Sequence, residues 1–138
     1  MTDTIVRRAL AGIALLALAA PLGAQEKPDA SAAAKGQIIY VRYCASCHGV
    51  AGRGDGAIAR DLRVPPTDLT RLAAQNRGRF PLDAVRQSID GRKATAGHGS
   101  PDMPVWGEIF PRTAGTDSPN TESATWRIAH YLWTIQAK

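Results

Sequence analysis

The sequence contains few of the residues that fill a protein core. Of the 114 residues that follow Ala24, Leu, Ile, Val and Phe together account for 19, about 17%. That is below the roughly 20% at which a chain begins to lack enough apolar side chains. With 15 basic and 11 acidic residues, this part is not charged enough to be plainly disordered. The scarcity excludes a large enzyme core, a large parallel sheet and a multidomain protein, and favours a small domain that needs something besides its own side chains at its centre.

The sequence also lacks an apolar run long enough to span a membrane comfortably. Residues 9–20 form an apolar run of 12 residues, whereas a spanning helix needs about 20. Two arginines precede this run and small residues follow it, an arrangement typical of a secretory signal peptide. We therefore expect residues 1–24 to be a signal peptide cut after Ala24, with Ala20 as the alternative, and the mature protein to be exported. An uncleaved N-terminal anchor is the rival interpretation.

Strand-like alternation and internal repeats are absent, and the apolar residues recur at helical spacing instead. Ile128, Leu132 and Ile135 form one such stripe. We predict an all-α domain over residues 31–138 with long loops, preceded by a flexible stretch over residues 25–30. The expected elements are a helix over 31–48 with Ser31 as N-cap, an irregular loop over 49–70, a helix over 81–90 stopped by Gly91, a short turn within 105–110, and a last helix starting at Ser118-Pro119.

One motif carries clear chemistry. Cys44, Cys47 and His48 form a C-x-x-C-H sequence, the attachment signature of a c-type haem. Two thiols three residues apart on a helical turn reach two vinyl groups on one edge of a porphyrin, and the histidine that follows lies beneath the iron as its proximal ligand. Because this attachment is made outside the cytoplasm, the expected signal peptide agrees with the motif. The sequence therefore predicts one haem c, bound covalently through both cysteines.

Three other uses of the cysteine pair remain as alternatives. A redox dithiol requires the alternating strands and helices of a thioredoxin-like domain, which the pattern does not show. A zinc site requires four N or S ligands, drawn from the two cysteines, His48, His98 and His130, and no second paired ligand spacing is present. A disulfide between Cys44 and Cys47 is expected to be strained and leaves His48 unexplained.

A haem that does not bind substrate needs a second axial ligand. Met103 is the single methionine after Ala24, and prolines lie on both sides of it. A stiff loop is a sensible way to hold a weak thioether ligand, because little ordering entropy is then lost when it binds. We therefore predict that His48 and Met103 ligate the iron. His98 is the second choice, although a hydrogen bond to a haem propionate or to the Met103 loop is the role expected for it, and His130 is expected to be a surface or helix-packing residue.

The sequence resembles the class I c-type cytochromes, specifically the bacterial monohaem proteins of the periplasm. The resemblance extends from about Ala33 to Ile135, and three segments carry it: residues 36–49 with the C-x-x-C-H motif, residues 103–107 (Met-Pro-Val-Trp-Gly), and residues 126–132. It implies three main helices and long loops wrapped around one covalent haem. The N- and C-terminal helices would cross, with Gly36 allowing the two backbones to approach and Tyr40 and Tyr131 packing around the crossing.

The same resemblance implies roles for several further residues. A proline carbonyl would accept a hydrogen bond from the proximal imidazole and raise its basicity. Pro66 is the first choice for this carbonyl and Pro65 the second. Trp106 would pack beside the haem with its indole N–H near a propionate, and Arg92 is a candidate partner for a propionate.

The excess of positive charge lies in one segment. Residues 60–93 contain eight basic and four acidic residues, whereas the rest of the chain after Ala24 contains seven of each. We interpret the segment as a docking face that steers an acidic redox partner; a solvated surface that offsets the haem propionates is the alternative. Nucleic acid is not an expected partner. Membrane association is expected only through an uncleaved signal segment or a partner complex.

These patterns predict an electron carrier rather than an enzyme. With His48 and Met103 both bound to iron, no coordination position remains for a substrate, and the haem would cycle between Fe(III) and Fe(II). A non-catalytic cytochrome subunit of a larger periplasmic oxidoreductase is the second hypothesis. A haem enzyme or sensor with an open sixth site is the third.

Overall fold

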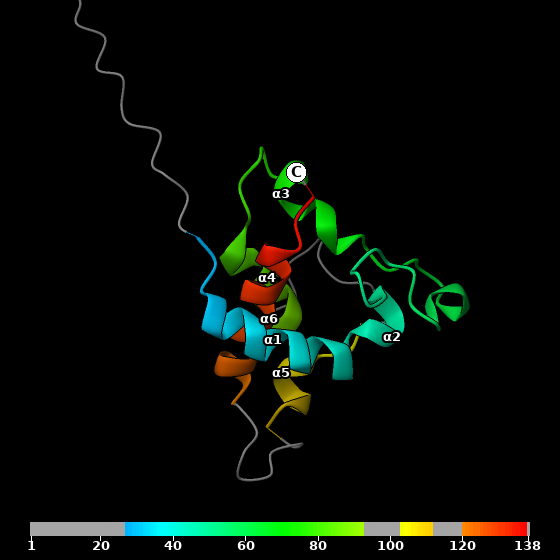
Figure 1. Ribbon diagram of the computed structural model, residues 1–138. Helices are drawn as coiled ribbons and strands as arrows, with labels where there is room; N and C mark the ends of the chain where they lie inside the picture. The colour runs from blue at the N-terminus through cyan, green and yellow to red at the C-terminus, as the bar shows by residue number, and fades with distance from the viewer. Residues whose placement is uncertain (1–26, 93–102, 112–119, 138) are drawn as a thin grey trace, which may run out of the picture.

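The computed structural model describes residues 27–92, 103–111 and 120–137. These residues form helices and loops, and no strand occurs among them. Three longer helices are α1 (Ala30–Tyr43), α4 (Leu82–Asp90) and α6 (Thr121–Thr134) (Figure 1). The shorter ones are α2 (Ala45–His48), α3 (Leu72–Gln75), α5 (Trp106–Ile109) and the 3-10 turns η1 (Ala59–Asp61) and η2 (Leu69–Arg71). The predicted all-α class is confirmed.

The first helix begins earlier than expected. Asp29, not Ser31, is the N-cap of α1, and its carboxylate accepts a hydrogen bond from Ala32 N at 2.8 Å. The backbone N–H of Asp29 also donates to His130 Nδ1 at 2.8 Å. The start of the domain therefore lies within the segment expected to be flexible, because both the side chain and the backbone of Asp29 are held.

The helix predicted over residues 31–48 is divided in two. Cys44 separates α1 from α2, and its N–H still donates to Tyr40 O at 2.8 Å. After it, the N–H groups of Cys47 and His48 both donate to Cys44 O, so the haem-binding motif occupies a short helical turn of its own. The motif therefore does not lie on a continuation of α1.

The most extensive helix packing is between α1 and α6 (Figure 1). Gly36 permits it, because a Cβ at this position would overlap the carbonyl of Arg127 in α6. Tyr40 and Tyr131 pack across the crossing with their ring centroids 5.1 Å apart. Tyr40 is fully buried, and its hydroxyl donates to Gly49 O at 2.6 Å. The crossing expected from the resemblance, with its small residue and two tyrosines, is present.

The ends of the other long helices follow ordinary capping rules. Gly91 stops α4 in the left-handed conformation at φ 69°, as predicted. The N-cap of α6 is Asn120, whose side chain accepts from Ser123 N at 2.8 Å; the expected cap at Ser118-Pro119 lies outside the described residues. Among the described residues, no helix is both long and apolar enough to span a membrane.

The helix α3 was not expected from the sequence. It lies beside the C-terminal end of the chain in Figure 1, where Gln136 Oε1 accepts from Ala73 N at 2.8 Å. This long-range bond satisfies an N–H group at the start of α3. A tertiary contact of this kind leaves no signature in local propensity.

Candidate functional site: a cavity lined by the C-x-x-C-H motif

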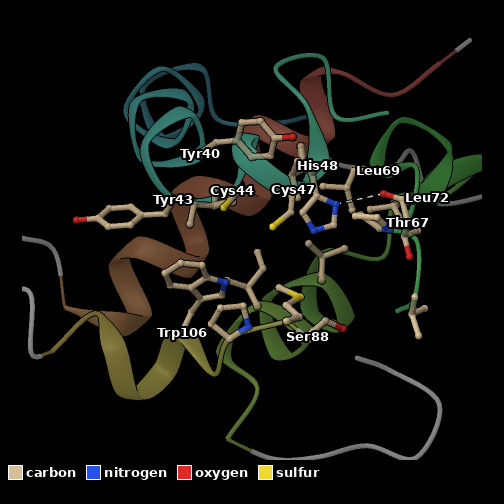
Figure 2. Close-up of a pocket in the computed structure, with 18 of the residues that line it drawn as sticks. Tyr40, Tyr43, Cys44, Cys47, His48, Thr67, Leu69, Leu72, Ser88 and Trp106 are labelled. Carbon is tan, nitrogen blue, oxygen red and sulfur yellow. Dashed lines mark hydrogen bonds between the residues drawn. The ribbon is translucent and has the colours of Figure 1, made fainter. Parts of the chain in front are cut away.

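A cavity of about 640 Å³ opens between the haem-binding motif and the α4–α5 region (Figure 2). This volume is within the range of small-molecule and cofactor sites, about 300–1,000 Å³. The residues on its walls are mostly apolar, as expected for a site that excludes water. They include Tyr40, Tyr43, Cys44, Cys47, His48, Leu62, Val64, Pro65, Pro66, Thr67, Leu69, Leu72, Val85, Ile89, Met103, Pro104, Trp106, Ile128 and Leu132.

Both cysteines of the motif line this cavity as free thiols. Figure 2 shows the side chains of Cys44 and Cys47 directed into it, with His48 beside them. Burial raises the pKa of the Cys44 thiol to about 12. Cys44 is therefore a poor nucleophile, unlike the reactive thiol of a redox pair, whose pKa is lowered toward neutrality.

A hydrogen bond with the backbone of Thr67 orients the imidazole ring of His48. Its Nδ1 lies 3.2 Å from Thr67 O, and since a carbonyl can only accept, Nδ1 carries the proton. Burial lowers the pKa of His48, partly opposed by this hydrogen bond. The imidazole is therefore neutral, with Nε2 free of its proton, which is the form that binds a metal.

The carbonyl that faces His48 was assigned to the wrong residue. It belongs to Thr67, whereas Pro66 had been the first choice and Pro65 the second. Both prolines line the cavity, but the carbonyl of Pro66 points at Gly54 instead, where an added Cβ would overlap it. The register of this loop depends on that backbone approach, so the acceptor is one residue later.

A second loop packs its backbone onto the motif. Gly54 N donates to His48 O at 2.8 Å, Gly56 N to Cys47 O at 3.1 Å, and Ile58 N to Ser46 O at 3.1 Å. A side chain at Gly56 would overlap the carbonyl of Ser46. These contacts were not predicted individually, although the Gly-Asp-Gly spacing of residues 54–56 was a visible signal of close backbone approach.

Met103 and Trp106 line the same cavity from a distant part of the chain. Trp106 is 9% exposed and lies across the cavity from Cys44 and Cys47 in Figure 2. Its ring stacks on Phe110 at 5.3 Å and meets the edge of Tyr43 at 5.7 Å. The structure therefore brings together Cys44, Cys47, His48, Met103 and Trp106, which the sequence had singled out.

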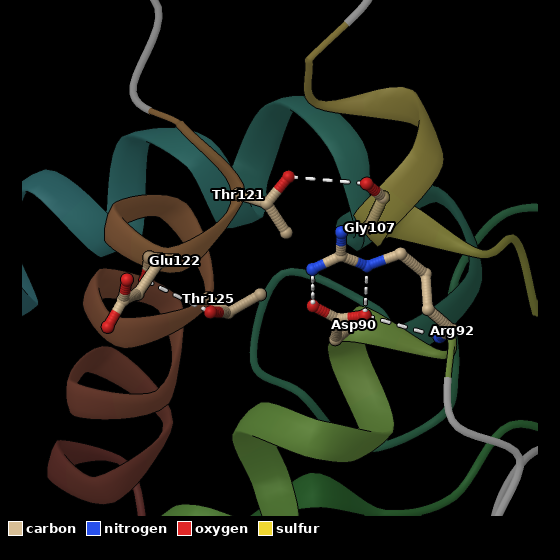
Figure 3. A network of polar contacts seen from close by, with 6 residues as sticks. All are labelled: Asp90, Arg92, Gly107, Thr121, Glu122 and Thr125. Atoms are coloured by element: carbon tan, nitrogen blue, oxygen red, sulfur yellow. Dashed lines mark hydrogen bonds and ion pairs between the residues drawn. The ribbon is translucent and has the colours of Figure 1, made fainter.

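Arg92 has a different place from the one expected. Its Nε and a terminal nitrogen both bond to the Asp90 carboxylate at 2.7 Å, as Figure 3 shows. A Cβ at Gly107 would lie 2.5 Å from Arg92 Nε, so the absence of a side chain at Gly107 makes room for the pair. Arg92 is not among the residues that line the cavity, because Asp90 holds its guanidinium elsewhere. His98 lies outside the described residues.

The donor set fits a haem better than a metal ion alone. Within residues 27–92, 103–111 and 120–137, no three His, Cys, Asp or Glu side chains are grouped as a metal site. A cavity with apolar walls, two adjacent thiols, one neutral imidazole and one thioether instead suits a large flat apolar cofactor with a single metal. The fold and this site define a c-type cytochrome domain.

Comparison with known proteins agrees with this class. The family model described as "Cytochrome C oxidase, cbb3-type, subunit III" matches residues 31–132. The chain belongs to this family of c-type cytochrome domains. This family membership agrees with the predicted role in electron transfer.

A solved structure shows the same fold. A chain of the Kuenenia stuttgartiensis reducing HAO-like protein complex is similar, with a TM-score of 0.53, 24% sequence identity and 83% of this chain covered. The match covers 48% of that chain, so this protein spans about half its length. No match is found among the curated proteins.

Proposed function

We propose that this protein is a periplasmic electron-transfer cytochrome with one haem c, bound covalently through Cys44 and Cys47 and ligated by His48 and Met103. The observation that supports this most is the convergence of all four side chains on one apolar cavity. Two widely separated segments contribute them, so the convergence comes from the fold and not from adjacency in sequence. When bound, the haem supplies the one-electron Fe(III)/Fe(II) chemistry.

The chain's own residues orient the ligands and exclude water. Thr67 O fixes the His48 ring, and a hydrogen bond from Nδ1 makes an imidazole a more basic ligand. Met103, which lines the same cavity, would hold the iron through its thioether, a ligand that favours the ferrous state and raises the potential. Trp106 closes one wall of the cavity behind this pair of ligands.

Loading the protein with haem and varying its ligands tests the proposal. After expression with the haem-attachment machinery in the periplasm, we expect a haem that remains with the chain on denaturing gels, one per polypeptide. The untreated ferric protein should be low-spin. Met103→Ala should convert it to high-spin and abolish the ferric charge-transfer band typical of Met ligation.

Ser46→Ala provides a matched control, because Ser46 lies between the two cysteines and its side chain is exposed. This variant should keep the spectrum of the wild type. High-spin ferric haem in the wild-type protein would overturn the His48/Met103 ligation, and an unattached haem would overturn the covalent assignment.

A subunit of a larger oxidoreductase is the second candidate. The family description names an oxidase subunit, and the similar structure belongs to a multisubunit complex. A free carrier would elute as a monomer from periplasmic extracts, whereas a subunit would co-purify with a partner. Affinity purification under native conditions, followed by mass spectrometry, distinguishes the two.

The surface charge supports docking to an acidic partner in either case. Arg86 and Arg92 pair with acidic residues of the domain. Further basic residues of the segment are exposed on the loops and short helices between α2 and α4, namely Arg60, Arg71, Arg77 and Arg79, and Arg63 is exposed in the same region. Electron-transfer rates with the partner should fall as ionic strength rises, and rates independent of salt would contradict this docking face.

A further inference from the structure

The side chain of Gln136 ties the C-terminal end of the chain to the segment that carries Thr67. Its Nε2 donates to Leu69 O at 2.8 Å, and its Oε1 accepts from Ala73 N at 2.8 Å. The same Nε2 lies 2.7 Å from Leu132 O, on α6. The amide therefore joins the end of α6 to η2, 67 residues earlier in the sequence, and to α3, 63 residues earlier.

A backbone bond next to Gln136 strengthens this connection. Ala137 N donates to Thr70 O at 2.8 Å. Gly52 lies on the other side of the same segment, and its carbonyl accepts from Leu69 N at 2.7 Å. Both polar backbone groups of Leu69 are thus held by other parts of the chain, one by a loop and one by Gln136.

We call the contacts of the Gln136 side chain with Leu69, Ala73 and Leu132 the Gln136 clasp. There is little free space around this clasp. A Cβ at Gly52 would lie 2.8 Å from Ile135 Cδ1 and 3.7 Å from Leu69 Cβ. The C-terminal residues, the loop at Gly52 and η2 therefore pack directly against one another. A shift of one of them displaces the others.

The clasp lies two residues from the carbonyl that orients His48. Between them, Asp68 makes a tight turn in which its carboxylate accepts from Thr70 N at 2.9 Å and from Thr70 Oγ1 at 2.6 Å. Asp68 is thus the N-cap of η2 and joins the peptide that carries Thr67 O directly to Leu69. The position of Leu69 therefore constrains Thr67 O from its C-terminal side, while the approach of Pro66 O to Gly54 constrains it from the other side.

We propose that Gln136 is a positioning residue for the haem ligand: by holding Leu69 it keeps Thr67 O on His48 Nδ1 and thereby tunes the reduction potential. This rests on the proposed haem function. The hydrogen bond from Nδ1 makes the imidazole a stronger donor to iron, which favours the ferric state. Loosening the bond raises the potential.

Two substitutions separate the two ends of the amide. Gln136→Glu keeps an oxygen that accepts from Ala73 N but removes the donor to Leu69 O. Gln136→Ala removes both contacts. Thr134→Ala is the matched control, because Thr134 is exposed on the same helix end and bonds only to its own helix, at Tyr131 O.

The measurements are made on the haem-loaded full chain. In both Gln136 variants we expect hydrogen exchange at His48 Nδ1, followed by NMR of the ferrous protein, to accelerate about tenfold, equivalent to roughly 1.4 kcal/mol. The ratio of reduced to oxidised protein at a fixed solution potential should rise about threefold. Thr134→Ala should leave both quantities at their wild-type values.

Thermal unfolding of each variant separates positioning from stability alone. A Gln136 variant that melts earlier but keeps the wild-type exchange rate and potential would overturn the inference and leave the haem function intact. Where Gln136→Ala does not load haem, the isosteric Gln136→Glu decides by the same readouts. A wild-type protein that binds no haem would instead overturn the proposed function itself.

Discussion

The crossing of α1 with α6 and the cavity wall formed by residues 49–72 are held together in different ways. The crossing is stabilised by side-chain packing: Tyr40, Ile128 and Ala129 are almost fully buried, and Gly36 lets the two backbones approach. In the wall, backbone hydrogen bonds from Gly54, Gly56 and Ile58 hold the loop onto the motif. The apolar side chains at the crossing are therefore buried by other side chains of the protein itself.

In the cavity wall, by contrast, several apolar side chains are only partly buried by the protein. Leu62, Leu69 and Leu72 are only half-buried and face the cavity, and Val64 is 46% exposed. A bound porphyrin would cover them. The low number of core residues in the composition therefore affects the wall and not the crossing. The crossing is buried by the protein's own side chains, whereas we expect the wall to need the cofactor to complete its burial.

The largest effect is expected from removing the haem attachment. Replacing Cys44 and Cys47 together by Ser should leave a largely unfolded chain, because the cavity wall then has nothing to pack against. Far-UV circular dichroism should show most of the helical signal lost, with any residual hydrogen-exchange protection confined to α1 and α6. A cooperative, fully folded apoprotein would show that the wall is self-sufficient and would remove the contrast between the two regions.

The crossing itself is tested at Gly36. Gly36→Ala should destabilise the protein by about 3 kcal/mol, the upper part of the range for overpacked cores, because the new methyl group overlaps the Arg127 carbonyl. Urea unfolding of the loaded protein measures this. Gln37→Ala, on the exposed face of the same helix, should stay within about 0.5 kcal/mol of the wild type, and equal effects at both positions would contradict the close approach.

The wall is tested at Gly56. Gly56→Ala should cost about 1–2 kcal/mol, since the added methyl group overlaps the Ser46 carbonyl and pushes the loop off the motif. Unlike Gly36→Ala, it should accelerate hydrogen exchange in residues 54–58 while leaving exchange in α1 and α6 nearly unchanged. The neighbouring variant Ala57→Ser, at an exposed position, serves as the control. Faster exchange spread over both regions would show that they unfold as one unit.

The smallest effect concerns pH and the start of α1. His130 is 3% exposed, accepts from Asp29 N through Nδ1, and has no partner at Nε2. Burial lowers the pKa of His130, opposed by the Asp29 carboxylate and assisted by Arg86 of α4. Trp126 and Trp133 contribute no charge to its surroundings.

Because the unfolded chain then holds the proton more tightly, stability should fall as pH drops below the ordinary histidine value of 6.5. The loss amounts to about 1.4 kcal/mol for each unit by which the pKa is lowered, and it levels off below the folded pKa. Urea unfolding at pH 7.5 and 5.5, as about one unit on either side of that value, measures it. His130→Gln keeps an acceptor for Asp29 N–H but does not titrate, so its stability should depend less on pH; an unchanged dependence would exclude His130 as the cause.

Much of the fold and of the site was predictable from local patterns. Repeating apolar residues marked the three long helices, and Gly91 marked the end of α4. The C-x-x-C-H motif and the proline-flanked Met103 were recognisable because their chemistry is carried by neighbouring residues. The single turn of α5 also lies where it was expected.

Other features could not be read locally. Residues 72–75 (Leu-Ala-Ala-Gln) are good helix formers, but four of them are too few to specify a helix. The bond that satisfies Ala73 N at its start comes from Gln136. Arg92 has an acidic partner two residues away, but whether it pairs with Asp90 or reaches a propionate depends on the space left by Gly107. The N-cap of α1 is Asp29 and not Ser31, and the backbone N–H of Asp29 donates to Nδ1 of His130 in the last helix.

The sequence by itself determined the chemistry of this protein: two thiols, an imidazole and a thioether in a chain poor in core residues. Spacing along one helical turn is enough to define the haem-binding motif. Only the tertiary structure decided which carbonyl holds His48, because the register of the Thr67 segment depends on backbone contacts with Gly52 and Gly54 and on the clasp made by Gln136. Such contacts join residues far apart in the chain, and their geometry exists only once the helices have packed.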